Sequence, residues 1–264
     1  MQKIAVCYNV NIDYSKETME ELVKILLSFG VDADKLSIDD LKDGYDFVFV
    51  VGGDGTILKA ARFYARTSTP IFGINLGRLG FLSQSSKENL KTSVEKILKN
   101  EYHTESRIML QSGNRVALND FVVKGTTTGR TSRFILKING KFVCDYLADG
   151  IIVSTPTGST AYGLSAGGPV VSPSLRAFVI VPICPHTLTA RPIVVPDSEI
   201  ITICSGEDLT NYVASTDGQE FYEFENEIEI KKSEKSAILA LLDDSEFYSI
   251  LKNKLGWGTS QACS

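Results

Sequence analysis

The sequence is poor in histidine, in paired cysteines, in long apolar runs and in excess basic charge. Only His103 and His186 occur among the 264 residues, which excludes a histidine-rich metal centre and argues against a histidine base. The five cysteines lack the paired spacing of a zinc site, so we expect buried, reduced thiols. The longest apolar runs, residues 47–51 and 178–183, are much shorter than the roughly 20 residues that cross a membrane.

The net charge and the first residues of the chain exclude further classes of protein. A formal charge of −5 argues against a nucleic-acid binder, which normally presents a strongly basic surface to phosphates. Any phosphate recognition must then be local, through backbone amides and a few cations, and this favours a nucleotide over a polymer. Residues 3–6 begin an apolar strand rather than a secretion signal, so we expect a cytoplasmic protein without a membrane partner.

Strands and helices alternate in the first part of the chain. Apolar periodicity predicts strands at 3–10, 46–51 and 71–76, and helices at 15–29, 57–65 and 88–99. In the first helix Ser15 is the expected N-cap and Gly30 the expected stop. This alternation predicts a Rossmann-like parallel α/β domain over residues 1–103.

After about residue 105 the pattern changes to short β-like segments. They lie at 116–124, 134–138, 151–154, 200–204 and 227–230. The pair Asn139-Gly140 is a strong hairpin signal. The pattern predicts a β-rich, sandwich-like domain over 104–240, with 241–264 packing back on the N-terminal domain and ending in a flexible tail.

The strand at 46–51 runs into Gly-Gly-Asp-Gly-Thr at 52–56, immediately before a helix. Glycines let the backbone approach a ligand, and free amides at a helix N-terminus attract phosphate oxygens. An aspartate in such a loop repels phosphate unless it accepts a proton or faces a magnesium-bound group. Asp54 is therefore a candidate general base for a hydroxyl nucleophile, the alternative being a simple helix N-cap.

A second segment, 149–162, carries an apolar strand into a run of hydroxyls, glycine and one tyrosine. Hydroxyl donors, exposed amides and an aromatic ring suit the phosphates, sugar and base of a nucleotide. A solvated turn before a helix is the structural alternative.

Together, 52–56 and 155–162 resemble the two signature motifs of the NAD kinases. The resemblance continues through 75–82, 118–120, 148–150, 165–169 and 217–219. It implies an enzyme that transfers a phosphoryl group from ATP or a related donor to the 2′-hydroxyl of the adenosine ribose of NAD, giving NADP.

The resemblance also implies roles for particular residues, with Asp54 as the proton acceptor. The positions that it assigns to substrate binding are Gly55, Lys59, Phe81, Asn119, Asp120, Arg130, Asp149, Thr157, Thr160, Ala161, Tyr162, Ser165 and Gln219. Asn119 and Asp120 match the pair that holds the adenosine part, and Asp149 matches a residue near the nicotinamide end. No carboxylate cage for a metal is present, so Mg²⁺ or another divalent cation should arrive on the donor phosphates.

One position departs from the family. Leu147 stands where many bacterial members have an arginine linked to discrimination between NAD and NADH, which leaves acceptance of NADH open. The preferred phosphoryl donor is open as well. The resemblance suggests a homodimer or homotetramer, with the β-rich domain as the interface.

Two other functions fit parts of the sequence. A lipid or sugar kinase of the same broad superfamily is one, although the Gly-Thr-Gly-Asn-Asp loop of a diacylglycerol-type kinase is absent. A non-catalytic NAD-sensing module is the other, and the presence of Asp54 argues against it.

Overall fold

The computed structural model describes residues 3–77, 80–126, 131–206, 212–242 and 246–256. The chain divides into two compact units, unit 1 with Met1–Ser106 and Ala237–Ser264, and unit 2 with Arg107–Ser236. It passes from one unit to the other within β6 (His103–Ser112) and again within β17 (Glu227–Leu241). The expected flexible tail falls on 257–264, outside the described residues.

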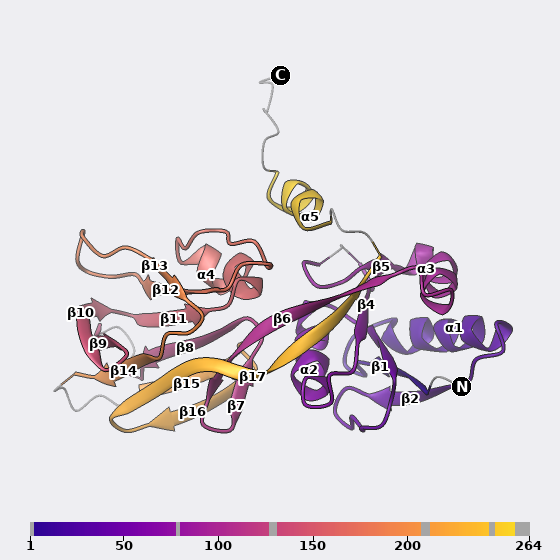
Figure 1. Cartoon of the computed structure of the whole chain (residues 1–264), viewed down its shortest axis with the longest axis horizontal. Helices are drawn as coiled ribbons and strands as arrows, with labels where there is room; N and C mark the ends of the chain where they lie inside the picture. Colours follow the sequence, from indigo (N-terminus) through magenta and orange to yellow (C-terminus); the bar gives the residue numbers. More distant parts are fainter. Residues whose placement is uncertain (1–2, 78–79, 127–130, 207–211, 243–245, 257–264) are drawn as a thin grey trace, which may run out of the picture. The chain divides into compact units, whose positions relative to one another are not determined.

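Unit 1 is built on a parallel sheet (Figure 1). Its main strands, in the order β4-β3-β1-β2, are β4 (Ile71–Asn75), β3 (Phe47–Val51), β1 (Ile4–Tyr8) and β2 (Ala33–Ser37). The short β5 (Ser85–Ser86) and the end of β17 pair with β4. The predicted Rossmann-like α/β fold is confirmed. β2 was not among the strands predicted from the sequence, because this edge strand exposes the charged residues Asp34 and Lys35.

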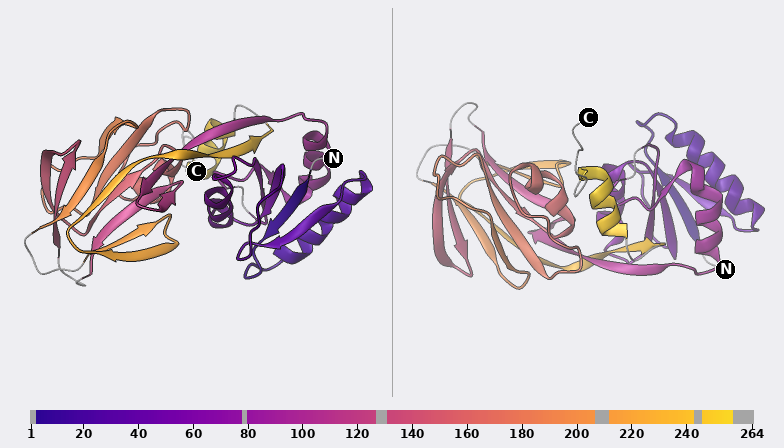
Figure 2. Two further views of the ribbon diagram at one scale, coloured as in Figure 1. Left: turned by 60° about the horizontal axis from the view of Figure 1, so that its bottom comes forward. Right: turned by 90° about the horizontal axis from the view of Figure 1, so that it is seen from above.

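Helices cover both faces of this sheet (Figures 1 and 2). On one face α1 (Ser15–Ser28) and α3 (Leu90–Leu98) pack on β1, β3 and β4 in a shared apolar core. On the other face lies α2 (Asp54–Tyr64), which contacts β3 and β4. A Cβ on Gly73 of β4 would lie 2.5 Å from Ile57 Cδ1 and 3.1 Å from the backbone atoms Leu82 O and Ser83 Cα, so the strand is tightly packed at this glycine. A 3-10 turn, η1 (Lys87–Asn89), precedes α3, and α5 (Glu246–Leu255) ends the described chain.

The start of α1 differs from the expectation. Its N-cap is Tyr14, in the left-handed region with φ 62°, and not Ser15. Ser15 is the first residue of the helix, and its hydroxyl accepts from Asn9 N and donates to Val51 O. The serine therefore ties the helix to the ends of β1 and β3, a tertiary role that a local capping pattern does not reveal.

Unit 2 contains two sheets. One is antiparallel, with the order β13-β12-β11-β8-β15-β16, and comprises β13 (Ile193–Pro196), β12 (Ala177–Ile183), β11 (Gly150–Ser154), β8 (Asp120–Gly125), β15 (Tyr212–Thr216) and β16 (Glu220–Phe224). The other has the order β10-β9-β14-β17, with β10 (Lys141–Ala148), β9 (Ser132–Ile138) and β14 (Ile201–Ser205). β7 (Arg115–Ala117) pairs with β6. The sequence between β11 and β12 forms a 3-10 turn, η2 (Thr157–Thr160), and the short α4 (Tyr162–Ser165).

The two sheets enclose one apolar core, as expected for the predicted sandwich-like domain. Along β11 the side chains alternate, because Ile151 and Val153 belong to this core while Ile152 joins a smaller cluster with Val171 and Val179. The predicted β-rich fold is confirmed, as is the hairpin of β9 and β10 at Asn139-Gly140.

The cysteines agree only in part with the expectation of buried thiols. Cys7 and Cys204 are buried and Cys144 is half-buried, all of them free, and burial raises the pKa of the Cys7 thiol to about 12. Cys184 is exposed, because it follows β12 directly in a left-handed turn with φ 45°. Cys263 lies outside the described residues.

In the described part of the chain, no helix has both the length and the apolar character needed to cross a membrane.

Candidate functional site

The strand order of unit 1 places a switch point between β1 and β3. From β1 the chain moves outward to β2 and then returns to β3 on the other side of β1. Ligands of open α/β sheets bind outside the carboxyl ends of the strands at such a point. Here these ends lead to Asn9 and to the glycine loop at Gly52 and Gly53.

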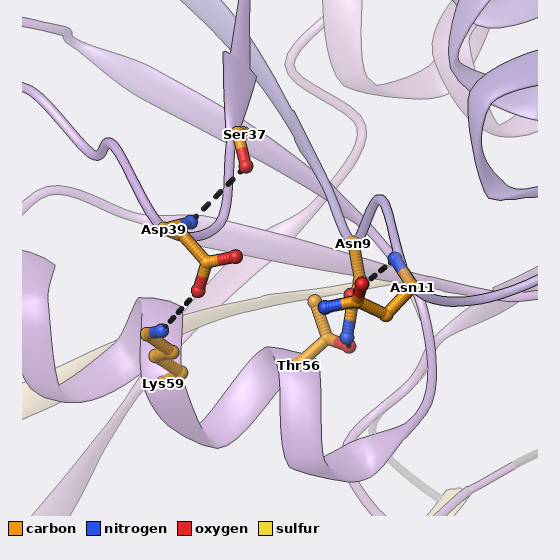
Figure 3. Close-up of polar contacts among 6 residues, drawn as sticks. All are labelled: Asn9, Asn11, Ser37, Asp39, Thr56 and Lys59. Carbon is orange, nitrogen blue, oxygen red and sulfur yellow. Dashed lines mark hydrogen bonds and ion pairs between the residues drawn. The ribbon is translucent and has the colours of Figure 1, made fainter.

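The glycine loop is tightly built around the start of α2. Gly53 is the N-cap of the helix in extended conformation, and a Cβ on Gly52 would lie 2.5 Å from Thr56 Oγ1. Asn9 Nδ2 lies 3.4 Å from Thr56 Oγ1, so the ends of β1 and α2 meet (Figure 3). The positive end of the α2 dipole lies at this loop and favours phosphate oxygens there.

Asp54 is the first residue of α2, one position after the N-cap Gly53. Its carboxylate accepts from Phe81 N at 2.9 Å and from Leu82 N at 3.3 Å. A Cβ on Gly80 would lie 1.8 Å from Asp54 Oδ1, so this close packing requires glycine at position 80. The N-cap alternative for Asp54 is therefore wrong. Each carboxylate oxygen has two acceptor sites, which leaves capacity for a further donor besides these two amides.

Two other predicted residues of unit 1 have defined contacts. The ammonium of Lys59 pairs with Asp39 at 2.6 Å, and both side chains are about half exposed (Figure 3). Phe81 is half-buried, and Lys254 Nζ lies 5.0 Å from the centre of its ring. Gly55 is exposed on the first turn of α2.

Unit 2 contains a pocket of about 360 Å³, within the size range of small-molecule sites. Four residues predicted from the sequence meet there, namely Asn119, Asp120, Ala161 and Tyr162. Asn119 and Asp120 lie at the start of β8, and Ala161 and Tyr162 lie in the segment after β11. Gly158 allows these two segments to pack closely. A Cβ on Gly158 would lie 2.2 Å from Asn119 O, so the second motif rests directly on the backbone of Asn119.

Other residues that line the pocket were not predicted from the sequence, namely Val122, Lys124, Val213, Ser215 and Phe221. Asp217 and Gly218 also line it, and they belong to the resemblance at 217–219, which assigned them no role. The ammonium of Lys124 lies 5.1 Å from the centre of the Tyr162 ring, which is a cation–π distance. The Phe221 ring is 69% exposed and could stack on a base. Rings, an ammonium, an amide and carboxylates together suit the base, phosphates and hydroxyls of a nucleotide.

Two carboxylates lie close together in this pocket. Burial, and then the charge of Asp217, raise the pKa of Asp120 from 3.8 to about 7. Asp120 is only 4% exposed. It is therefore poised to exchange a proton near neutral pH.

The remaining predicted residues lie outside the pocket lining. Thr157 is buried, and Arg107 Nη1, itself on a buried side chain, lies 3.4 Å from its hydroxyl. Thr160 is half-buried and donates to Thr157 O, whereas the others are exposed, namely Asp149, Ser165 and Gln219. Arg107 was missed, although an arginine followed by Ile-Met-Leu in a strand is the kind of buried cation that sequence can reveal.

Arg130 and Leu147 are the two other positions that the sequence singled out. Arg130 falls outside the described residues, so its predicted role stays a prediction. Leu147, at the departure from the family pattern, lies on β10 with its side chain 43% exposed. Within the described residues no group of three or more His, Cys, Asp or Glu side chains could hold a metal ion.

Both halves of the chain match models of one family. Residues 7–102 match the ATP-NAD kinase N-terminal domain, and residues 118–242 match the ATP-NAD kinase C-terminal domain. The chain belongs to the NAD kinase family. It is accordingly a kinase, as the sequence predicted, and the lipid or sugar kinase and the non-catalytic module are set aside.

Individual relatives agree with this membership. The chain is 39% identical to an NAD kinase of Thermoanaerobacter sp. (strain X514), with 97% of this chain and 99% of the relative covered. It is 44% identical to an NAD kinase of Pseudomonas fluorescens (strain SBW25) over 81% of this chain and 76% of the relative.

Two solved structures share the fold. The crystal structure of an NAD kinase from Archaeoglobus fulgidus in complex with ATP has a TM-score of 0.82 and 29% identity, and covers 96% of this chain and 98% of that chain. Yeast NADH kinase complexed with NADH has a TM-score of 0.88 over 100% of this chain and 90% of that chain. At 24% identity, the yeast enzyme supports the fold alone.

Proposed function

We propose that the protein phosphorylates the 2′-hydroxyl of the adenosine ribose of NAD, with ATP as donor, and so makes NADP. The observation that carries this proposal is the convergence of Asn119, Asp120, Ala161 and Tyr162 in one pocket of nucleotide size. Family membership and the ATP complex of the Archaeoglobus relative support the donor.

In this proposal the pocket of unit 2 holds NAD. The Asn119 amide and the Asp120 carboxyl offer hydrogen-bond partners to ribose hydroxyls or to the adenine amine. The Tyr162 ring offers a face for the base, and the ammonium of Lys124 beside it offers a charge for the pyrophosphate. Orientation of the dinucleotide would follow from these fixed groups.

The donor phosphates are proposed to bind at the carboxyl ends of β1 and β3. The positive end of the α2 dipole favours phosphate charge there. Lys59 lies further along the same helix, and its pair with Asp39 is a surface ion pair, which typically contributes about 1 kcal/mol or less. Exchanging Asp39 for a phosphate therefore costs little. Mg²⁺, arriving on the nucleotide, would neutralise charge on the phosphoryl group during transfer.

Asp54 is proposed as the general base. A ribose hydroxyl is a poor nucleophile at neutral pH, so a carboxylate within hydrogen-bond reach assists by accepting its proton. The amides of Phe81 and Leu82 fix the orientation of this carboxylate. They also mean that an Asp54→Asn variant replaces one acceptor oxygen by a donor, so its stability needs to be measured with its activity.

The test is formation of NADP from NAD, detected with an NADP-specific dehydrogenase. ATP, other nucleoside triphosphates and polyphosphate are offered in turn, each with and without Mg²⁺, and NADH is offered as an alternative acceptor. We expect turnover with ATP that is lost in excess chelator. Undiminished turnover in chelator would contradict the role of the cation, and failure with every donor would contradict the function.

A further inference from the structure

The backbone that presents Asn119 and Asp120 to the pocket is held by one distant carboxylate. Asp217 Oδ2 accepts from Leu118 N at 3.1 Å, and its Oδ1 accepts from Asn119 N at 2.7 Å and from Asp120 N at 3.2 Å. Three successive N–H groups around one carboxylate form an anion-binding nest, closed here by a side chain from the same chain.

The carbonyl groups of the same residues are also occupied. Leu118 O accepts from Thr155 Oγ1 at 2.5 Å, and Asn119 O accepts from Thr155 N at 2.9 Å. Asp120 O accepts from the backbone N of Asp217 at 2.9 Å. Every backbone N–H and C=O from 118 to 120 thus has a partner, and Asp217 supplies four of these hydrogen bonds.

Turn geometry does not by itself explain the aspartate. Asp217 and Gly218 have φ of 51° and 64° and form the two central residues of the turn between β15 and β16. Asn139 and Gly140, with φ of 50° and 73°, fill the same two positions between β9 and β10. Asparagine and aspartate both tolerate this left-handed conformation. The turn therefore accepts either asparagine or aspartate at position 217, whereas the three N–H groups of the nest require a carboxylate.

We propose that Asp217 is a positioning residue, whose carboxylate fixes the Leu118–Asp120 backbone and so aims the Asn119 and Asp120 side chains at NAD. The proposal rests on the proposed function, because it takes NAD as the occupant of this pocket. Asp217 itself need not touch the substrate in this role.

A second consequence distinguishes positioning from general support of the fold. The negative charge of Asp217 contributes to the raised pKa of Asp120. The other titratable groups that line the pocket are Lys124 of β8 and Tyr162 of α4, with the ammonium beside the ring. Removing the charge of Asp217 should therefore lower the pKa of Asp120, and a substitution that only loosened the turn should not.

The test compares Asp217→Asn with Asn139→Ala. In Asp217→Asn the left-handed turn and two of the N–H bonds can persist, but the amide group then faces Leu118 N–H, donor against donor. Asn139→Ala is the control, because it removes the favoured residue from the equivalent turn between β9 and β10. It also removes the hydrogen bond that Asn139 Oδ1 accepts from Ile200 N, and Asn139 does not line the pocket. Binding of NAD is measured by calorimetry across pH, with the melting temperature of each protein.

For Asp217→Asn we expect NAD affinity to fall by about tenfold to a hundredfold, the effect of losing one hydrogen bond to a charged group. KM for NAD should rise more than kcat falls, and the midpoint of the pH dependence of binding should move to lower pH. Asn139→Ala should change the melting temperature alone.

Unchanged affinity and pH midpoint in Asp217→Asn would overturn the proposal, as would an equal loss of affinity in Asn139→Ala. If the unsubstituted protein does not bind NAD at all, the proposed function fails first. If instead the unsubstituted protein and Asp217→Asn bind NAD equally well, only the positioning role of Asp217 is overturned.

Discussion

The Asp120 carboxyl gives a prediction about stability that needs no substrate. Its pKa is raised from 3.8 to about 7 in the folded protein by burial and by Asp217. Between these values the folded state holds a proton that the unfolded chain releases, so stability falls as pH rises from about 4 to about 7. Each pKa unit is worth about 1.4 kcal/mol, and the full difference therefore amounts to about 4 kcal/mol.

The assay compares the protein with Asp120→Asn, whose amide stays neutral at every pH. Carboxyls remote from Asp120 contribute equally to both proteins and cancel in the comparison. Between about pH 5 and about pH 8 the protein should lose about 2–3 kcal/mol relative to Asp120→Asn. Chemical denaturation followed by circular dichroism at the two pH values measures this difference. If the free energies of unfolding of the two proteins change with pH in parallel, the raised pKa of Asp120 is refuted.

Other substitutions test single contacts. Asp54→Asn should lower kcat by about 10² to 10⁴-fold with NAD affinity kept, and retention of more than about a tenth of turnover in a folded variant would contradict the general base. Tyr162→Ala should weaken NAD binding by roughly 1–3 kcal/mol, through loss of the ring beside Lys124, and an unchanged dissociation constant would make Tyr162 structural. Gly73→Ala should cost about 1–3 kcal/mol of stability, because its Cβ would lie 3.1 Å from the backbone atoms Leu82 O and Ser83 Cα as well as 2.5 Å from Ile57 Cδ1; an unshifted melting temperature would be inconsistent with those contacts.

Much of unit 1 could be predicted because its signals are local. β1, β3 and β4 are continuous apolar runs, as strands covered on both faces must be. The glycine loop follows one of them directly, so its place at the carboxyl edge of the sheet was predictable. The edge strand β2 was missed because its exposed charges break the apolar run.

The pocket of unit 2 could be predicted only in part. Asn119 and Tyr162 belong to recognisable motifs, but Lys124 and Phe221 stand in strands without any chemical signature. The role of Asp217 depends on amides almost a hundred residues earlier in the chain. A local pattern identifies a turn at this position, and only the strand pairing of β8 with β15 reveals what the carboxylate holds.

The central claim is phosphoryl transfer to one particular hydroxyl, and locating the transferred phosphate tests it most directly. ATP labelled in its γ-phosphate is incubated with NAD, Mg²⁺ and the protein, and the position of the label on the product is determined by mass spectrometry and by phosphorus NMR. The account predicts one labelled phosphate on the adenosine-ribose 2′-oxygen, with little label transferred by Asp54→Asn. Label at any other hydroxyl, or no transfer by the unsubstituted protein, would contradict it.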